Sequence, residues 1–144
     1  MSVTKGNHCA YDVHYHVVFP VKYRKALLYP HVTSAIQEIA VQISERYAVE
    51  FEQMGTDGDH IHILTAFHPK LSGSNFVQLF KSITARELFR RFPELRKELW
   101  GGEFWTDGYF ISTVGRRGDW ETVERYVANQ GKTTGTTLQL KLWS

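Results

Sequence analysis

The chain has 144 residues, of which 42% are hydrophobic and 22% are charged, and its formal net charge is +2. This composition excludes a disordered or collagen-like chain, and the length suits one domain, here residues 1–144 with a core at about 10–130 and a tail at 131–144. No apolar run reaches the roughly 18 residues that a membrane helix needs, and the start lacks the apolar core of a secretion signal. The lone Cys9 cannot form an internal disulfide. We therefore expect a cytoplasmic protein.

The first half of the chain predicts two strands paired as a hairpin, preceded by one strand and one helix. Alternating β-rich residues predict a strand over 10–19, which Pro20 ends. Ser34 and Gln37 have the form of a capping box, and apolar residues at helical spacing follow, which predicts a helix over roughly 34–47. Residues 49–54 and 60–67 predict the two strands of a hairpin around the turn residues 56–59.

The second half predicts two further helices and one short strand. Residues 71–74 form a loop, a helix follows over roughly 75–92 and is closed by Pro93, and 110–114 is β-rich. After the flexible basic segment 115–118, Asp119 is a plausible cap for a third helix that ends near Gly131. Strands interleaved with helices around a hairpin predict an α+β domain with an antiparallel sheet.

The small net charge conceals two basic blocks. Residues 1–25 carry four basic residues and one acidic residue, and residues 81–101 carry six and three, while the intervening segment is acidic. A basic surface suits a polyanion, because each neutralised phosphate releases counterions, although solvated helix faces carry similar charges. Aromatic residues make up 14% of the chain. Most of these rings should fill the core, and some are candidates for stacking on bases.

The pair His60 and His62 is the most distinctive motif. On a strand, residues i and i+2 face the same side, with Cα atoms about 6.5–7 Å apart. Two imidazoles at that spacing can bind one cation through bonds of about 2 Å, while Ile61 and Ile63 face a core. Two histidines on a polar strand face without any function would give the same pattern.

The third predicted helix offers a reactive group and a further ligand. Tyr126 and Gln130 are four residues apart and therefore share one helix face. An amide oxygen is an acceptable ligand for Mg²⁺ or Mn²⁺, and imidazole together with oxygen suits Mn²⁺. Tyr126 lies beside such a metal only if this helix docks on the 60–67 strand; otherwise it is an amphipathic tyrosine whose hydroxyl reaches water.

With these motifs in place, the sequence resembles the small single-tyrosine HUH transposases of the TnpA type, which move insertion sequences as single-stranded DNA. HUH denotes histidine, hydrophobic, histidine, here His60-Ile61-His62. Four segments carry the likeness in the order and roughly at the spacing of the family: residues 17–24, 59–64, 104–115 and 126–130. The ordered set is far more specific than the histidine pair alone.

The resemblance implies a ferredoxin-like sandwich whose C-terminal helix carries the tyrosine. It further implies a homodimer in which the histidine pair of one subunit meets the tyrosine helix of the other, with Gly115 and Gly118 as hinges. His60, His62 and Gln130 would hold Mg²⁺ or Mn²⁺ against the scissile phosphate. Tyr126 would attack it, giving a 5′-phosphotyrosine and a free 3′-hydroxyl. The substrates would be hairpins at single-stranded element ends in a bacterial or archaeal cytoplasm, with the enzyme at the nucleoid when bound to DNA.

Basic residues near these motifs are expected to contact the DNA. The candidates are Lys22, Tyr23, Arg24, Lys25, Lys81, Arg86, Arg116 and Arg117. Two other histidines, His14 and His16, share a strand face and are interpreted as core or DNA-face residues, because no reactive partner accompanies them in the sequence. No role is assigned to the remaining histidines.

Two other classes of function remain open from the residues. A non-catalytic module that binds single-stranded nucleic acid could share this fold. The presence of Tyr126, both histidines and Gln130 favours an enzyme. A nucleotide hydrolase of the histidine-triad kind needs a third alternate histidine, and Leu64 occupies that position. Plasmid relaxases and rolling-circle initiators share the expected chemistry but usually have longer chains.

Overall fold

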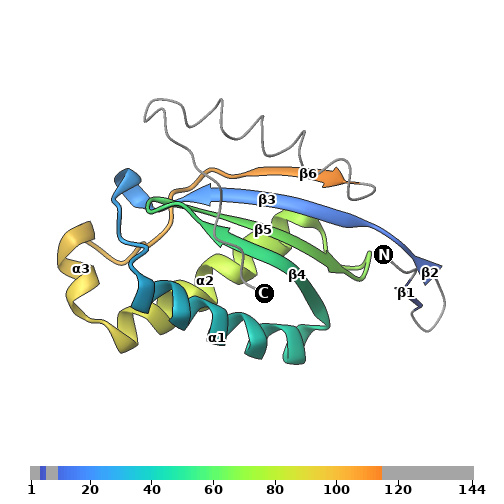
Figure 1. Ribbon diagram of the computed structural model, residues 1–144, viewed down its shortest axis with the longest axis horizontal. Coiled ribbons are helices and arrows are strands. Elements are labelled where there is room, and N and C mark those ends of the chain that lie inside the picture. Colours follow the sequence, from blue (N-terminus) through green and yellow to red (C-terminus); the bar gives the residue numbers. More distant parts are fainter. Residues whose placement is uncertain (1–3, 6–9, 115–144) are drawn as a thin grey trace.

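A four-stranded antiparallel sheet forms the centre of the protein (Figure 1). The computed structural model describes residues 4–5 and 10–114. The strands lie in the order β4-β5-β3-β6. Their bounds are His14–Pro20 for β3, Val49–Thr56 for β4, His60–Phe67 for β5 and Phe110–Val114 for β6. Two short strands, β1 (Thr4–Lys5) and β2 (Ala10–Tyr11), pair with each other apart from this sheet.

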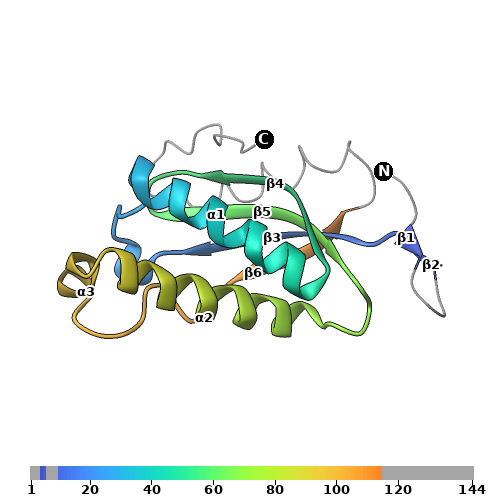
Figure 2. The same cartoon turned by 90° about the horizontal axis from the view of Figure 1, so that it is seen from below.

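Two long helices cover one face of the sheet, as Figures 1 and 2 show together. These are α1 (Pro30–Tyr47) and α2 (Gly73–Arg91), which pack against each other. A 3₁₀ turn, η1 (Lys22–Arg24), follows β3, and a short helix, α3 (Glu94–Leu99), follows α2. Ile39 of α1 and Phe80 of α2 are fully buried against sheet residues such as Phe19. The predicted α+β class with an antiparallel sheet is therefore confirmed.

Two strands match their predicted ranges, and the hairpin pairing of β4 with β5 is confirmed. The end strand β4 extends two residues further than predicted. The predicted first strand is divided, because only His14–Pro20 joins the main sheet while Ala10–Tyr11 pairs with β1. The short helix α3 was not predicted, since six residues are too few for a clear apolar period.

The predicted start of the first helix is wrong. Helix α1 begins at Pro30, four residues before Ser34, and Tyr29 precedes it in an extended conformation. Proline fits the first helical position because its nitrogen lacks the hydrogen that would otherwise be unpaired there, and its φ is already helical. Ser34 therefore lies inside the helix and caps nothing. The predicted start of the second helix shifts by two residues, because Ser72 caps α2 by accepting from the backbone N–H of Asn75 at 3.1 Å.

The predicted third helix, at about 119–131, and the tail lie outside the described residues. Among the helices that the structure does describe, none is long and apolar enough to cross a membrane.

Candidate metal centre and nucleic-acid interface

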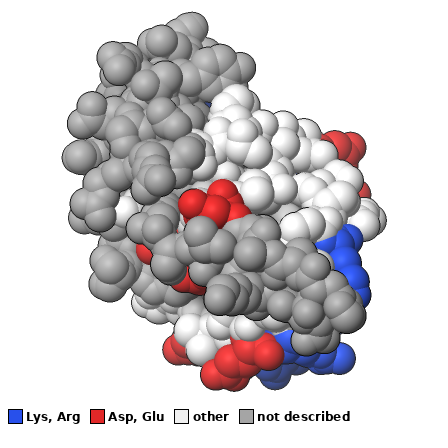
Figure 3. All heavy atoms as spheres, turned by 90° about the vertical axis from the view of Figure 1, so that its right-hand side faces the viewer, with Lys and Arg blue, Asp and Glu red and all other residues white. Residues whose placement is uncertain are grey.

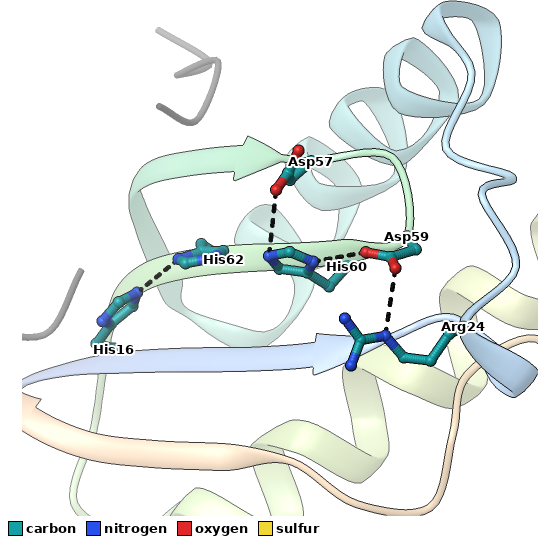
Figure 4. A network of polar contacts seen from close by, with 6 residues as sticks. All are labelled: His16, Arg24, Asp57, Asp59, His60 and His62. Carbon is teal, nitrogen blue, oxygen red and sulfur yellow. Dashed lines mark hydrogen bonds and ion pairs between the residues drawn. The ribbon is translucent and has the colours of Figure 1, made fainter. Parts of the chain in front are cut away.

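His60 and His62 lie side by side on β5, next to the centre of the sheet (Figure 4). Their ring centroids are 5.1 Å apart, and the two residues are 6% and 1% exposed. The alternating residues Ile61 and Ile63 are fully buried in the core on the other face. Strand alternation thus separates a polar pair from an apolar pair, as the sequence predicts.

A carboxylate orients the ring of His60. Its Nδ1 lies 2.7 Å from Oδ1 of Asp59, and the other oxygen of Asp59 accepts from Nε of Arg24 at 3.2 Å. Because a carboxylate only accepts, Nδ1 must carry a proton, so Nε2 is the nitrogen that has the lone pair in the neutral form of the ring. Oδ2 of Asp57 lies 3.8 Å from that Nε2 and gives the site a negative neighbour. Figure 4 shows the chain of contacts from Arg24 through Asp59 to His60.

The ring of His62 meets a third histidine. Nδ1 of His62 is 3.2 Å from Nε2 of His16, which reaches it from β3 (Figure 4). Burial lowers the pKa of His62 to about 2, with further lowering from charge on His16 and His60, and burial lowers the pKa of His16 to about 4. Both rings are therefore neutral near pH 7, and neutral imidazole is the form that ligates metals.

The two Nε2 atoms are the candidate ligands for a divalent cation. Neither makes a hydrogen bond to any residue that the structure describes, although both are buried. Buried polar atoms without a partner are uncommon, and here both belong to imidazole rings that lie side by side. Within the described ranges, no group of three or more His, Cys, Asp or Glu side chains could hold a metal. The pair therefore needs a further ligand, and the predicted one, Gln130, lies outside the described residues together with Tyr126.

The first basic segment is compensated by acidic side chains. Lys22 pairs with Glu103, Arg24 with Asp59, and Lys25 with Glu98 at 3.5 Å. Tyr23 lies between them with its side chain outward, since the residue is 56% exposed. Figure 3 shows the opposite end of the molecule, where the basic and acidic side chains of the described part also lie close to one another.

Of the two predicted DNA contacts in the second basic segment, one is exposed and the other has a structural role. Arg86 is exposed on α2. Lys81 instead donates to the backbone oxygens of Thr106 and Gly108, at 2.6 and 3.0 Å, and burial lowers its pKa. This lysine therefore ties the loop before β6 to α2. Arg116, Arg117, Gly115 and Gly118 lie outside the described residues.

Sequence reasoning did not predict the contacts of three residues of this region, although it interpreted His16 as a core or DNA-face residue and included Asp59 in the motif segment 59–64. Asp59 and His16 contact the histidine pair, and Trp100, at the end of α3, is 76% exposed. The Trp100 ring lies 5.5 Å from that of Tyr23, and Nζ of Lys25 lies 5.4 Å from its centroid. The neighbours of Trp100 in the sequence, two glycines after a charged segment, were the signal that it is not a core residue.

Together the fold and site define a class: an α+β domain whose sheet carries a histidine–hydrophobic–histidine strand on the face away from its helices. The family model described as "Transposase IS200 like" matches residues 9–130, and the chain belongs to this family. The resemblance inferred from the four sequence segments is thereby confirmed.

Relatives and solved structures agree with this assignment. The ISDra2 transposase TnpA of Deinococcus radiodurans is 30% identical over 130 residues, covering 90% of this chain and 92% of the relative. The transposase for insertion sequence element IS200 of Salmonella typhimurium is 30% identical over 123 residues, or 85% of this chain and 80% of the relative. The crystal structure of a transposase candidate from Deinococcus radiodurans R1 superposes with a TM-score of 0.74 and has 28% sequence identity. The match covers 88% of this chain and 97% of the other chain.

A more distant structure shares the fold alone. It is a REP-associated tyrosine transposase bound to a REP hairpin, 10% identical with a TM-score of 0.57, and the match covers 94% of this chain and 75% of that chain.

Proposed function

We propose that this protein is a metal-dependent tyrosine transposase that cuts and rejoins single-stranded insertion-sequence ends at DNA hairpins. The observation that carries the proposal is the histidine pair, two buried rings whose Nε2 atoms lack hydrogen bonds to described residues. Membership of the IS200-like family and the position of Tyr126 and Gln130 within the matched residues support it.

His60, His62 and Gln130 would hold a divalent ion, Mg²⁺ or Mn²⁺. When bound, such an ion supplies Lewis-acid polarisation of a non-bridging phosphate oxygen and positions the phosphorus. The protein prepares the ligands: Asp59 keeps the proton of His60 on Nδ1, and Arg24 holds Asp59. The buried surroundings keep the pKa of His62 far below neutrality, so its ring does not take up a proton.

Tyr126 is the proposed nucleophile. Its phenol loses a proton, and its oxygen forms a bond to phosphorus while the bond from phosphorus to the 3′-oxygen breaks. The leaving 3′-oxygen takes up a proton, so the products are a 5′-phosphotyrosine and a free 3′-hydroxyl. One ester bond replaces another, so rejoining by a different 3′-hydroxyl needs no ATP.

The proposed partners are single-stranded DNA hairpins and a second copy of the chain. In the homodimer, Tyr126 of one subunit would act at the histidine pair of the other, with Gly115 and Gly118 as hinges. Of the residues expected to contact DNA, Tyr23 and Arg86 are exposed and are proposed unchanged. Arg116 and Arg117 are also proposed as DNA contacts. To bind phosphate, four other basic side chains would have to leave their present hydrogen-bond and ion-pair partners: Lys22, Arg24, Lys25 and Lys81. The site of action would be the cytoplasm, at the nucleoid.

The test uses labelled single-stranded element ends with Mg²⁺ or Mn²⁺ and a denaturing gel. We expect a covalent protein–DNA adduct from the unmodified protein, none with a chelator, and none from Tyr126→Phe. His60→Ala and His62→Ala should lose cleavage and keep DNA binding, whereas His31→Ala on the exposed start of α1 should cleave normally. Binding without any adduct would instead identify a non-catalytic DNA-binding module.

A further inference from the structure

The register of the sheet brings His16 to His62. Strand β3 runs antiparallel to β5, with Val18 opposite His62 and His16 opposite Leu64. His16 and His62 are therefore diagonal neighbours on one face, a distance that long side chains bridge. The ring of Phe110, from β6, meets the His16 ring edge-on at 6.3 Å between centroids. His16 is thus placed by three adjacent strands.

The proton between these rings has two possible positions with opposite consequences. If His16 donates from Nε2, then Nδ1 of neutral His62 must accept, and the proton of His62 sits on Nε2. A protonated Nε2 cannot bind a cation. If His62 donates from Nδ1 instead, its Nε2 keeps a lone pair beside that of His60. Only the second arrangement makes a two-histidine metal centre.

We propose that His16 is a positioning residue: its Nε2 accepts the Nδ1 proton of His62 and so fixes the tautomer and ring orientation that leave Nε2 of His62 available to a divalent cation. This inference rests on the proposed function, because it concerns the same metal centre. His16 is in turn the counterpart of Asp59, which does the same for His60.

Burial explains why a histidine rather than a carboxylate has this task. Asp59 lies at the edge of the site, where Arg24 balances its charge. His16 is fully buried, and an ionised carboxylate there would require a paired cation within the sheet. A neutral imidazole accepts a hydrogen bond without introducing charge.

The experiment compares His16→Gln with His16→Leu. The oxygen of Gln can take the place of Nε2 as acceptor, whereas Leu fills similar space without an acceptor. Mn²⁺ alone is titrated into the full chain by calorimetry, and long-range ¹H–¹⁵N spectra of the metal-free protein report which ring nitrogens carry protons. His14→Gln, on the same strand but bound to Asp12 and Glu52, is the matched control.

We expect His16→Leu to weaken Mn²⁺ binding by about 10–100-fold, the usual effect of losing such an orienting partner, and His16→Gln to restore most of it. In the spectra, Nδ1 of His62 should carry the proton in the unmodified protein and lose that preference in His16→Leu. Equal Mn²⁺ affinity in all variants, or a proton on Nε2 of His62 in the unmodified protein, would overturn the inference. Absence of Mn²⁺ binding by the unmodified protein, with the expected tautomer present, would instead contradict the proposed metal centre.

Discussion

His14 lies two residues before His16 on β3, but it contacts carboxylates instead of another histidine. Its Nδ1 lies 2.7 Å from Glu52 and its Nε2 2.8 Å from Asp12, so both nitrogens face carboxylates. Burial lowers the pKa of His14, but the hydrogen bonds and charges of Asp12 and Glu52 outweigh it, and the pKa is raised above its ordinary value of 6.5. When it is protonated, the ring of His14 connects β3 to β4 across β5 and contributes to stability.

This arrangement predicts a pH-dependent stability difference. Because the pKa is higher in the folded state, the contribution of His14 is fully present below 6.5 and is lost as the pH rises through the folded-state pKa. His14→Gln should therefore be destabilised most at about pH 5.5 and least at about pH 9. Urea unfolding of both proteins across this range measures it, and a difference that grows toward alkaline pH would contradict the assignment.

A second residue-scale prediction concerns a buried hydrogen bond beneath the sheet. Nε1 of Trp105 donates to Oγ1 of Thr84 at 2.8 Å, and both residues are buried. Thr84→Val removes the acceptor and leaves the indole N–H without a partner, so we expect a loss of about 1–3 kcal/mol in the free energy of unfolding. Ser82→Ala, on the exposed side of the same helix, is the control and should change stability by less than about 0.5 kcal/mol. Equal losses would show that the bond is unimportant.

At the residue scale, the sequence predicted which face of a strand a side chain occupies, because that depends on the strand period. It did not predict contacts between side chains on different strands. Alternation placed His60 and His62 on one face. His62 and His16 are 46 positions apart in the sequence, and their contact depends on the register between β3 and β5. No local sequence pattern encodes that register. Likewise Lys81, expected at phosphates, meets two backbone oxygens of a loop 25 and 27 residues away.

At the element scale, helix starts depend on which residue caps them. Each of the two long helices has a serine near its start, Ser34 in α1 and Ser72 before α2, and of these two only Ser72 caps its helix. Ser34 lies inside α1, whose start is set by Pro30. A capping-box pattern cannot distinguish a helix start from an interior turn when a proline upstream also permits helix. This is why the period of the helix was predicted and its first turn was not.

The paired serines give an element-scale prediction. Ser72→Ala removes the acceptor for the N–H of Asn75 and should lower the free energy of unfolding by about 1 kcal/mol. Ser34→Ala replaces an exposed interior helix residue by the best helix former and should be neutral or slightly stabilising. Thermal unfolding of the two variants side by side measures both, and a larger loss for Ser34→Ala would contradict the observed start of α1.

At the scale of the whole molecule, the exposed aromatic pair Tyr23 and Trp100 is a candidate contact for unpaired bases. Such stacking contributes about 1–3 kcal/mol per base. Trp100→Ala should therefore weaken binding of a single-stranded element end by about 5–150-fold, with little effect on folding because the side chain is exposed. Fluorescence anisotropy measures the affinity, with Tyr29→Ala, on an exposed tyrosine before α1, as control. Unchanged affinity in Trp100→Ala would remove this residue from the interface.

The shared active site predicts complementation between inactive copies. If Tyr126 acts at the histidine pair of the other subunit, a heterodimer of His60→Ala with Tyr126→Phe contains one complete site. Co-expressed and purified through two different tags, this heterodimer should form the adduct although each variant alone does not. An inactive heterodimer would show that each subunit uses its own tyrosine.

Sequence motifs alone identified the family, but they could not show how its parts meet. Each of the four segments is a local pattern, so it can be recognised in the sequence. The docking of the tyrosine helix on β5 is a tertiary contact, and the spacing of residues along the chain does not determine it. Tyr126 and Gln130 lie outside the described residues, so their encounter with His60 and His62 remains a prediction.

The most direct test of that encounter is peptide mapping of the covalent adduct by tandem mass spectrometry. The unmodified protein is reacted with a single-stranded element end in Mn²⁺, the DNA is trimmed by nuclease, and the peptides are sequenced. We predict one modified residue, Tyr126, carrying a 5′-linked nucleotide remnant. A remnant on any other tyrosine, such as the exposed Tyr23, would contradict the account.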